Sequence, residues 1–193
     1  MTRSRRSVAG LSGATLALFA GALLAAPADA ALIDQGEDSF EFHDTINRYC
    51  GVNGLKVTSD GTFTTSFTAG TKGKDGLVYF AEHIDIVNTI TNPKTGLSAT
   101  IFESTTSKDL DVIDNGDGTL TIVILATGSS SVTGPDGTVI ARNPGQFRFS
   151  ILIDDGGTPS DPSDDEFITD LDVLKESTGR TDDYCAAIVD AIT

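Results

Sequence analysis

Glu82, Tyr79 and Arg148 have side chains that could orient a ligand or move a proton. Glu82 falls on the same face of a predicted strand as Phe80, which we assign to the core. A buried carboxylate needs a partner, and inside a cavity it could orient a bound molecule. Arg148 or Arg142 could be its counterion, so we predict a ligand site from Glu82, Tyr79 and Arg148. A β-bulge at Glu82 would instead turn this carboxylate outward, and we favour the bulge.

The two histidines are the remaining candidates for acid–base or metal chemistry. His83 shares a strand face with Tyr79 and Asp85, so it could act as a base or join a metal site. That face carries the polar residues of the strand, which favours a solvated surface, and His43 is interpreted in the same way. If both cysteines are paired, the chain offers too few ligands for zinc or copper.

Residues 154–166 form an acidic segment with several glycines and prolines and no base. Carboxylate and carbonyl oxygens of such a segment are ligands that calcium prefers, and calcium is the one cofactor that we consider. The spacing does not fit the helix–loop–helix calcium motif, so we favour a solvated loop between two strands. The calcium alternative would use Asp154, Asp155, Asp161, Asp164 and Asp165. Glycines interrupt a second acidic series, which we interpret as a hairpin tip: Asp109, Asp111, Asp114 and Asp117.

The charge of the chain excludes one large class of partners. Its 193 residues include 13 Lys and Arg against 28 Asp and Glu, a formal net charge of −15. A nucleic-acid backbone must be met by clustered basic residues, so we expect no nucleic-acid partner. The acidity favours solubility and could attract cations. Motifs for a catalytic nucleophile or a nucleotide cofactor are missing from the sequence.

Residues 1–30 have the features of an export signal. Three arginines precede an uncharged apolar run over 11–26, and Ala28-Asp29-Ala30 supplies a small-x-small cleavage pattern. The run is shorter than the ~20 residues of a membrane span. We therefore expect a secreted, extracellular protein that begins at Ala31 and has no membrane span. The arginine pair is only loosely similar to a twin-arginine signal, so export of the unfolded chain is favoured.

Cys50 and Cys185 are the only cysteines. An even number of cysteines in an exported chain favours a disulfide. A bridge that closes so long a loop would stabilise the fold by about 5 kcal/mol in the chain-entropy model. A redox pair or two free thiols are the alternatives, but neither has a Cys-x-x-Cys spacing or a neighbouring histidine in its favour.

The remainder of the chain has the pattern of β-structure. Runs of alternating apolar and polar residues, bounded by Gly, Asp, Asn and Pro turns, predict strands over 77–91, 97–113, 119–132 and 138–153. A straight strand of fifteen residues would extend about 50 Å, which exceeds the width of a domain of this size, so these strands must coil or bend. We predict one all-β domain over 31–193, an antiparallel up-and-down β-barrel or barrel-like sandwich of about eight strands.

One helix is predicted, over 181–192, with Thr181 as its N-cap. The predicted bridge from Cys185 would tie this short C-terminal helix to the barrel. The segment Leu120–Leu125 is apolar on both faces, so something must cover its second face. We expect the helix there, and the interface of a homodimer is the alternative. A monomer and a homodimer both remain open.

Three motifs near the C-terminus carry a resemblance: TPSDPSDDEF at 158–167, STGR at 177–180 and DYC at 183–185. Through them the last third of the chain resembles a set of uncharacterised secreted proteins of actinobacterial type. The resemblance implies export and brings no activity with it. The strand pattern alone is similar to calycin and allene-oxide-cyclase-like barrels, although the Gly-x-Trp motif of lipocalins is absent from a chain without Trp.

These observations leave three functions open. The first is a non-catalytic extracellular protein that binds a small apolar ligand or a surface partner, and we favour it because no catalytic pair can be placed. The second is a barrel enzyme of the cyclase or isomerase type, which needs a shaped apolar cavity and one or two polar groups. The third is a cell-envelope interaction protein with a filled barrel. The volume and lining of the barrel interior would separate the three.

Overall fold

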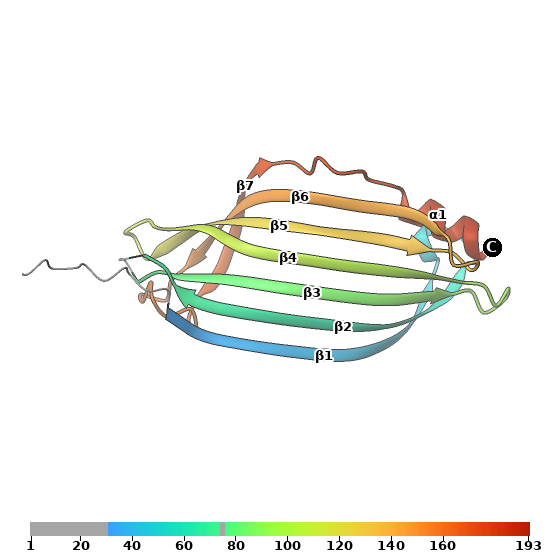
Figure 1. The fold of residues 1–193 in the computed structure, drawn as a ribbon, viewed down its shortest axis with the longest axis horizontal. Helices are drawn as coiled ribbons and strands as arrows, with labels where there is room; N and C mark the ends of the chain where they lie inside the picture. The colour runs from blue at the N-terminus through green and yellow to red at the C-terminus, as the bar shows by residue number, and fades with distance from the viewer. Residues whose placement is uncertain (1–30, 74–75) are drawn as a thin grey trace, which may run out of the picture.

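The computed structural model describes residues 31–73 and 76–193, and the predicted export signal lies outside them. The described residues form one antiparallel sheet in which each strand pairs with the next along the chain (Figure 1). A short helix, α1 (Tyr184–Ile192), follows the sheet, and a 3-10 turn, η1 (Tyr49–Gly51), precedes the second strand. The strands are β1 (Ala31–Asn47), β2 (Lys56–Thr71), β3 (Val78–Thr91), β4 (Ser98–Asp114), β5 (Thr119–Thr133), β6 (Val139–Asp154) and β7 (Glu166–Lys175).

The four strands predicted from alternation are strands β3 to β6, and their ends differ from the prediction by one residue at most. The strand ends could be predicted because their signals are local: side chains alternate between a buried and a solvated face, and turn residues follow at each end. The sheet has seven strands, whereas about eight were expected.

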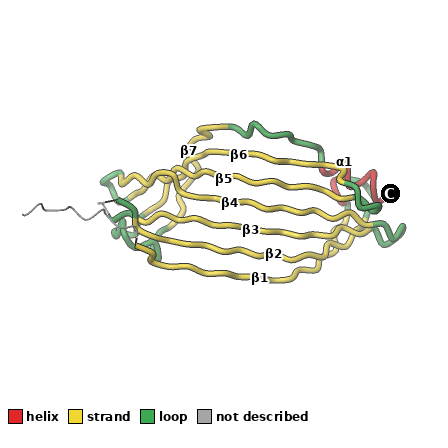
Figure 2. Tube along the Cα trace, viewed as in Figure 1, coloured by secondary structure: helices red, strands yellow, loops and turns green. Residues whose placement is uncertain are grey.

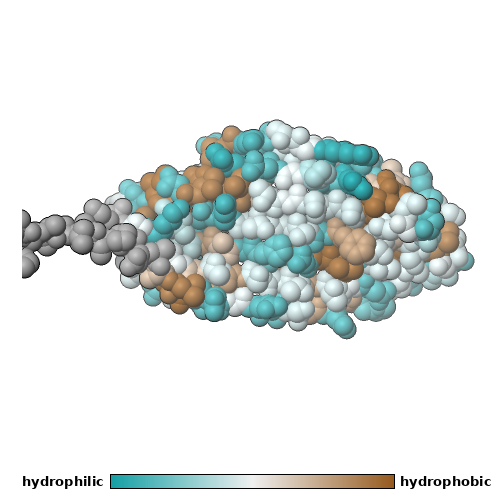
Figure 3. Space-filling model, viewed as in Figure 1, coloured by the Kyte–Doolittle hydropathy of each residue, from teal (hydrophilic) through white to brown (hydrophobic). Residues whose placement is uncertain are grey.

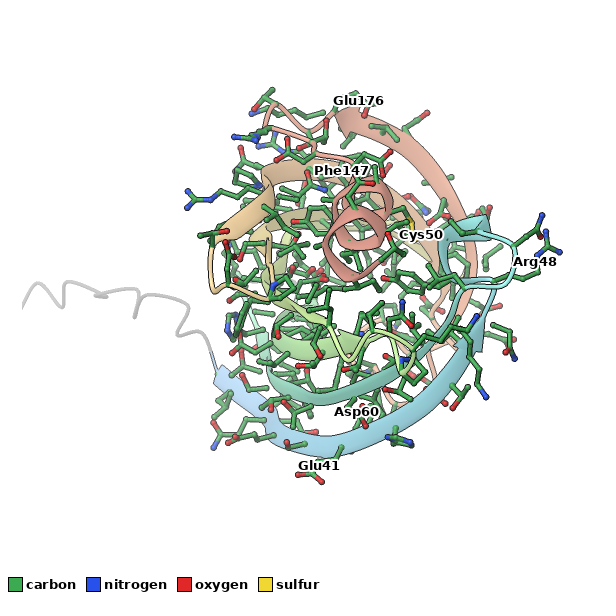
Figure 4. All side chains as sticks on the ribbon, turned by 90° about the vertical axis from the view of Figure 1, so that its right-hand side faces the viewer. Glu41, Arg48, Cys50, Asp60, Phe147 and Glu176 are labelled. Carbon is green, nitrogen blue, oxygen red and sulfur yellow. A yellow bond between two sulfur atoms is a disulfide. The ribbon has the colours of Figure 1, made fainter. Side chains whose placement is uncertain are left out.

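The sheet curls into an incomplete barrel. Viewed along its long axis, it curves around most of a circle, and β1 and β7 are its two unpaired edges (Figure 4). Strands of up to 17 residues are therefore coiled, as predicted. Gly61 allows one close approach within this curve, because a Cβ there would collide with the ring of Phe42 and the carbonyl oxygen of Val87. A larger residue at this position would have to displace the backbone of β3 at Val87 and the ring of Phe42.

Two groups of buried apolar side chains occupy the two ends of the barrel. The helix-end cluster joins the sheet to α1 and comprises Leu55, Val57, Ile90, Ala99, Val132, Ala141, Ile188 and Ile192. The hairpin-end cluster lies where the β4–β5 and β6–β7 connections begin and comprises Val112, Leu120 and Ile153, against which Leu77, Tyr79, Ile122 and Ile151 pack. Between the clusters, inner side chains such as Phe63 and Ile84 are only partly buried. The interior is therefore packed unevenly.

Helix α1 begins three residues later than predicted. Its N-cap is Asp183, whose carboxylate accepts a hydrogen bond from the N–H of Ala186 at 3.0 Å, so the prediction of Thr181 as the cap is wrong. The predicted disulfide joins Cys50 to Cys185 and fastens η1 to the first turn of α1 (Figure 4). Among the described residues, no helix has the length and apolarity needed to cross a membrane.

The helix covers a different part of the sheet from the one predicted. It packs on the helix-end cluster, and the buried amide of Asn92 holds its last turn by donating to the carbonyl oxygen of Ile192 at 3.0 Å. The segment Leu120–Leu125 lies at the other end of β5, so its outer face is not covered by α1. The outward side chains Val123 and Leu125 are half-buried beside their cross-strand neighbours Ser150 and Arg148 on β6.

The outer surface is mostly polar. On the face shown in Figure 3, hydrophilic and neutral side chains predominate, and apolar ones form separate groups. Large apolar side chains of the two edge strands are the most exposed, because within the described part of the chain these strands pair on one side only: Leu32, Phe40, Phe167 and Val173.

Candidate ligand-binding cavity

A partly enclosed cavity of about 410 Å³ lies at the hairpin end of the barrel, opposite α1. The starts of β1, β3 and β5 and the ends of β2 and β4 surround it. The loop between β6 and β7 lines it on a further side with Pro159, Asp161, Pro162, Ser163 and Asp165. This loop is one of those drawn in green at the left-hand end of Figure 2. The side chains of the unevenly packed interior leave this cavity unfilled.

Apolar side chains from the inner face of the sheet form most of its wall. Phe67 and Phe80 stack with ring centroids 5.5 Å apart and interplanar angle 23°. Ala69 lies directly across from Phe80 in the β2–β3 register, so alternate residues of neighbouring strands reach the same space. Other strands complete the apolar wall with Ile33, Val78, Leu120 and Ile122.

Asp109 enters the cavity where β3 and β4 part. Their last backbone pair at this end is Ala81 with Lys108, and the register of β4 with β5 shifts between Asp109 and Asp111. Beyond that pair, Asp109 Oδ2 accepts a hydrogen bond from the backbone N–H of Phe80 at 2.7 Å. Burial raises the pKa of this carboxyl to about 6, although the hydrogen bond from Phe80 lowers it.

Three more aspartates line the same cavity, namely Asp34 on β1 and Asp161 and Asp165 on the β6–β7 loop. Burial raises the pKa of Asp165, and repulsion by Asp164, Asp155, Asp161 and Asp154 raises it further. The pKa of Asp161 is lowered because Ser163 donates hydrogen bonds to it. Lys, Arg and His are absent from the described residues that line the cavity. The polar groups of the cavity wall therefore favour a positively charged ligand group over a negative one.

The β6–β7 loop owes its position to its own hydrogen bonds. The backbone N–H of Asp155 donates to the carbonyl oxygen of Gly118 at 3.0 Å, which fixes the loop to the β4–β5 hairpin. The buried carboxylate of Asp155 accepts from the N–H of Gly157, and Thr158 Oγ1 donates to Asp164 Oδ2 at 2.8 Å. These contacts hold the residues after 158 over the cavity.

The five aspartates of the calcium hypothesis divide into two groups. Asp161 and Asp165 reach the cavity wall, whereas Asp154, Asp155 and Asp164 do not line it. Asp154, Asp155, Asp161 and Asp164 accept hydrogen bonds within the loop. Within 31–73 and 76–193, no group of three or more acidic, histidine or cysteine side chains has the arrangement of a metal site. Calcium binding therefore stays a prediction from the sequence.

Glu82 lies on the inner face, so the prediction of a bulge that turns it outward is wrong. Strand β3 pairs with β2 and β4 in unbroken register through this residue, opposite Phe67 and Ser107. Its carboxylate accepts a hydrogen bond from Thr65 Oγ1 at 2.9 Å. The hydroxyl of Thr65 on β2 therefore accommodates the carboxylate, and Glu82 does not line this cavity.

Tyr79 and Arg148 are not brought together with Glu82. Tyr79 packs against the hairpin-end cluster, with Lys72 Nζ 4.9 Å from the centre of its ring. Arg148 lies across from Leu125 on the outward face of β6, and its Nε is buried without a hydrogen-bond partner among the described residues. Two strands separate β6 from β3. The three predicted site residues thus do not form one site.

Both histidines belong to polar surface contacts. His83 Nδ1 lies 2.9 Å from Thr106 Oγ1, and its Nε2 lies 3.1 Å from Asp85 Oδ2. His43 contacts Asp60, its cross-strand neighbour. Each imidazole is more than two-fifths exposed, which agrees with the interpretation as a solvated surface.

Searches against protein-family models, curated proteins and solved structures find no match to this chain. The resemblance of the C-terminal third to secreted actinobacterial proteins stays a prediction.

Proposed function

We propose that this chain is an exported, non-catalytic binding protein that holds a small apolar molecule in the hairpin-end cavity. One observation carries the proposal: a partly enclosed space of about 410 Å³ whose wall includes Phe67 and Phe80. Cavities that bind small ligands enclose roughly 300–1,000 Å³ and combine an apolar lining with a few polar groups. The disulfide supports the export part of the proposal, because such bonds persist in oxidising compartments.

Binding is better supported than the two alternatives. A cyclase or isomerase built on Glu82, Tyr79 and Arg148 would need these groups around one cavity, and they lie apart. Asp109 is half-buried with a pKa raised to about 6, but Asp161, the aspartate of the same cavity whose pKa is lowered, is held by hydrogen bonds from Ser163 within the loop. A filled barrel would leave no space next to Leu120 and Ile122.

The test is the binding of a neutral fluorescent probe, N-phenyl-1-naphthylamine, followed by the rise in its emission. We expect saturable binding with a Kd of about 1–100 µM, which is usual for an unoptimised apolar ligand. Ile122→Trp places a large ring in the cavity and should weaken binding at least tenfold. Val87→Trp places the same ring on the outer surface and should leave binding unchanged.

Probe binding can be compared only between folded proteins, so the melting temperature of each variant is measured as well. If Ile122→Trp does not fold, Ala69→Leu fills the same cavity by a smaller step. Equal emission from wild type and both cavity variants would place the probe elsewhere and refute the proposal.

A further inference from the structure

The cavity joins an apolar wall to polar groups of a single charge. Asp34, Asp109, Asp161 and Asp165 line it, and the described lining residues include no base. The nearest positive charge on β4 is Lys108, but it precedes Asp109 on the opposite, exposed face of the strand. Among the described residues that line the cavity, no base balances these carboxylates.

Asp109 and Asp165 come from different parts of the chain. Asp109 extends the inner face of β4 at the point where the strand leaves β3, and its Oδ2 is held by the N–H of Phe80. Asp165 stands at the end of the loop that covers the opening, one residue before β7. The two carboxylates reach the cavity from the sheet and from its cover, with Phe67 and Phe80 in the wall of the same space.

We propose that the ligand of this cavity is an organic cation, a small molecule with an apolar, preferably aromatic, body and one protonated amine. The proposal rests on the proposed function and names the chemical class of its ligand. The apolar body lies against Phe67 and Phe80, and the ammonium group lies between Asp109 and Asp165.

Three physical arguments favour this class. A carboxylate at an apolar wall is costly unless it is paired, and an ammonium group supplies three donors for charge-assisted hydrogen bonds. The faces of Phe67 and Phe80 also attract a cation that lies above them. An anionic ligand would add a further negative charge beside four aspartates, and a neutral ligand would leave them without a counter-ion from the described lining.

The test compares three probes with the same ring system: 1-naphthylmethylamine, 1-naphthalenemethanol and 1-naphthoate. Each is titrated by calorimetry into the wild-type protein at pH 7.5. We expect the amine to bind at least tenfold more tightly than the alcohol, and the carboxylate to bind more weakly than the alcohol. If the alcohol does not bind at millimolar concentration, the proposed function is refuted. If the alcohol and the amine bind equally well, only the proposal of a cationic ligand is refuted.

Variants that remove one charge test whether the cavity carboxylates cause the preference for the amine. Asp109→Asn keeps an oxygen that can accept from Phe80 but removes the charge, so the preference for the amine should fall about tenfold while binding of the alcohol is retained. Asp111→Asn removes an equal charge from an exposed position of the same strand and is the matched control. If Asp109→Asn does not fold, Asp165→Asn tests the second carboxylate. An amine preference that survives both cavity variants, or falls equally in the control, contradicts the proposal.

Discussion

The carboxylate of Asp109 accepts a hydrogen bond from the backbone N–H of Phe80, with 2.7 Å between Oδ2 and the nitrogen. This contact joins β3 and β4 just beyond their last backbone pair, and it leaves a half-buried carboxyl at the wall of an apolar cavity. An ionised group in such a place costs stability, and charged groups kept at this cost are concentrated at functional sites.

The first prediction concerns the pH dependence that Asp109 gives to stability. Its pKa is raised from 3.8 to about 6 in the folded state, so the folded state binds the proton more tightly than the unfolded state. The free energy of unfolding should therefore fall as the pH rises from 4 to 6. The shift corresponds to about 3 kcal/mol, and screening by solvent around this half-buried group reduces our expectation to about 1–2 kcal/mol.

Urea denaturation of wild type and Asp109→Asn at pH 4 and pH 7 measures this effect. The variant should be more stable than wild type at pH 7 and similar to it at pH 4, because Asn stays neutral. Asp111→Asn is the control for the loss of one charge. A difference in stability between wild type and the variant that is the same at pH 4 and pH 7 would contradict the raised pKa.

The second prediction concerns the disulfide between Cys50 and Cys185, which are separated by 135 positions. Replacing both with Ala should lower the free energy of unfolding by about 5 kcal/mol, because the unfolded chain loses the closure of a long loop. Chemical denaturation measures the loss. Thiol titration of the denatured, unreduced protein should find no free thiol, and two free thiols would show that the bridge does not form in the isolated protein.

The third prediction concerns calcium and the β6–β7 loop. Four of the five aspartates, all except Asp165, already accept hydrogen bonds inside the loop, so millimolar calcium should raise the melting temperature no more than magnesium at equal ionic strength. A rise specific to calcium that disappears when Asp161, Asp164 and Asp165 are replaced by Asn would establish a calcium site instead.

The fourth prediction is that the exported protein begins at Ala31. The uncharged run and the Ala28-Asp29-Ala30 pattern predict cleavage there. The intact mass of protein recovered from the culture medium should lack residues 1–30. A mass that includes them would contradict cleavage at this site.

Much of the sheet could be predicted from local sequence because its signals are local. The alternation in Val78–Thr91 and the turn residues on either side of it determine both the strand and the face of each side chain. Meander connections then place each strand beside the next, so the cross-strand pairing of Phe63 with Ile86 follows from hairpin geometry.

The cavity could not be predicted in the same way, because it depends on contacts between distant segments. Asp109 has the sequence context of a hairpin tip, and only the shift of register and the parting of β3 from β4 turn it inward. Asp165 reaches the cavity because a hydrogen bond from the N–H of Asp155 to the carbonyl oxygen of Gly118 fixes the β6–β7 loop. The two residues that form this bond are 37 positions apart in the sequence. The position of α1 likewise depends on the distant partner Asn92.

The same absence of long-range information explains the error at Glu82. The sequence marked a carboxylate on an apolar face as an anomaly, and a bulge is one way to remove it. The structure accommodates it in regular register through Thr65, a residue on the neighbouring strand. The hydroxyl residues of β2 and β4 were the signal that could have indicated this outcome.

The most direct test of the cavity is a methyl NMR titration of the protein with 1-naphthalenemethanol. Saturable shifts should appear at the methyl groups of Leu120, Ile122 and Val78, with none at Val57, Val132 and Ile188 at the far end of the barrel. Shifts confined to the exposed methyl groups of β1 and β7, or no saturable shift at the three cavity residues, would contradict binding in the cavity.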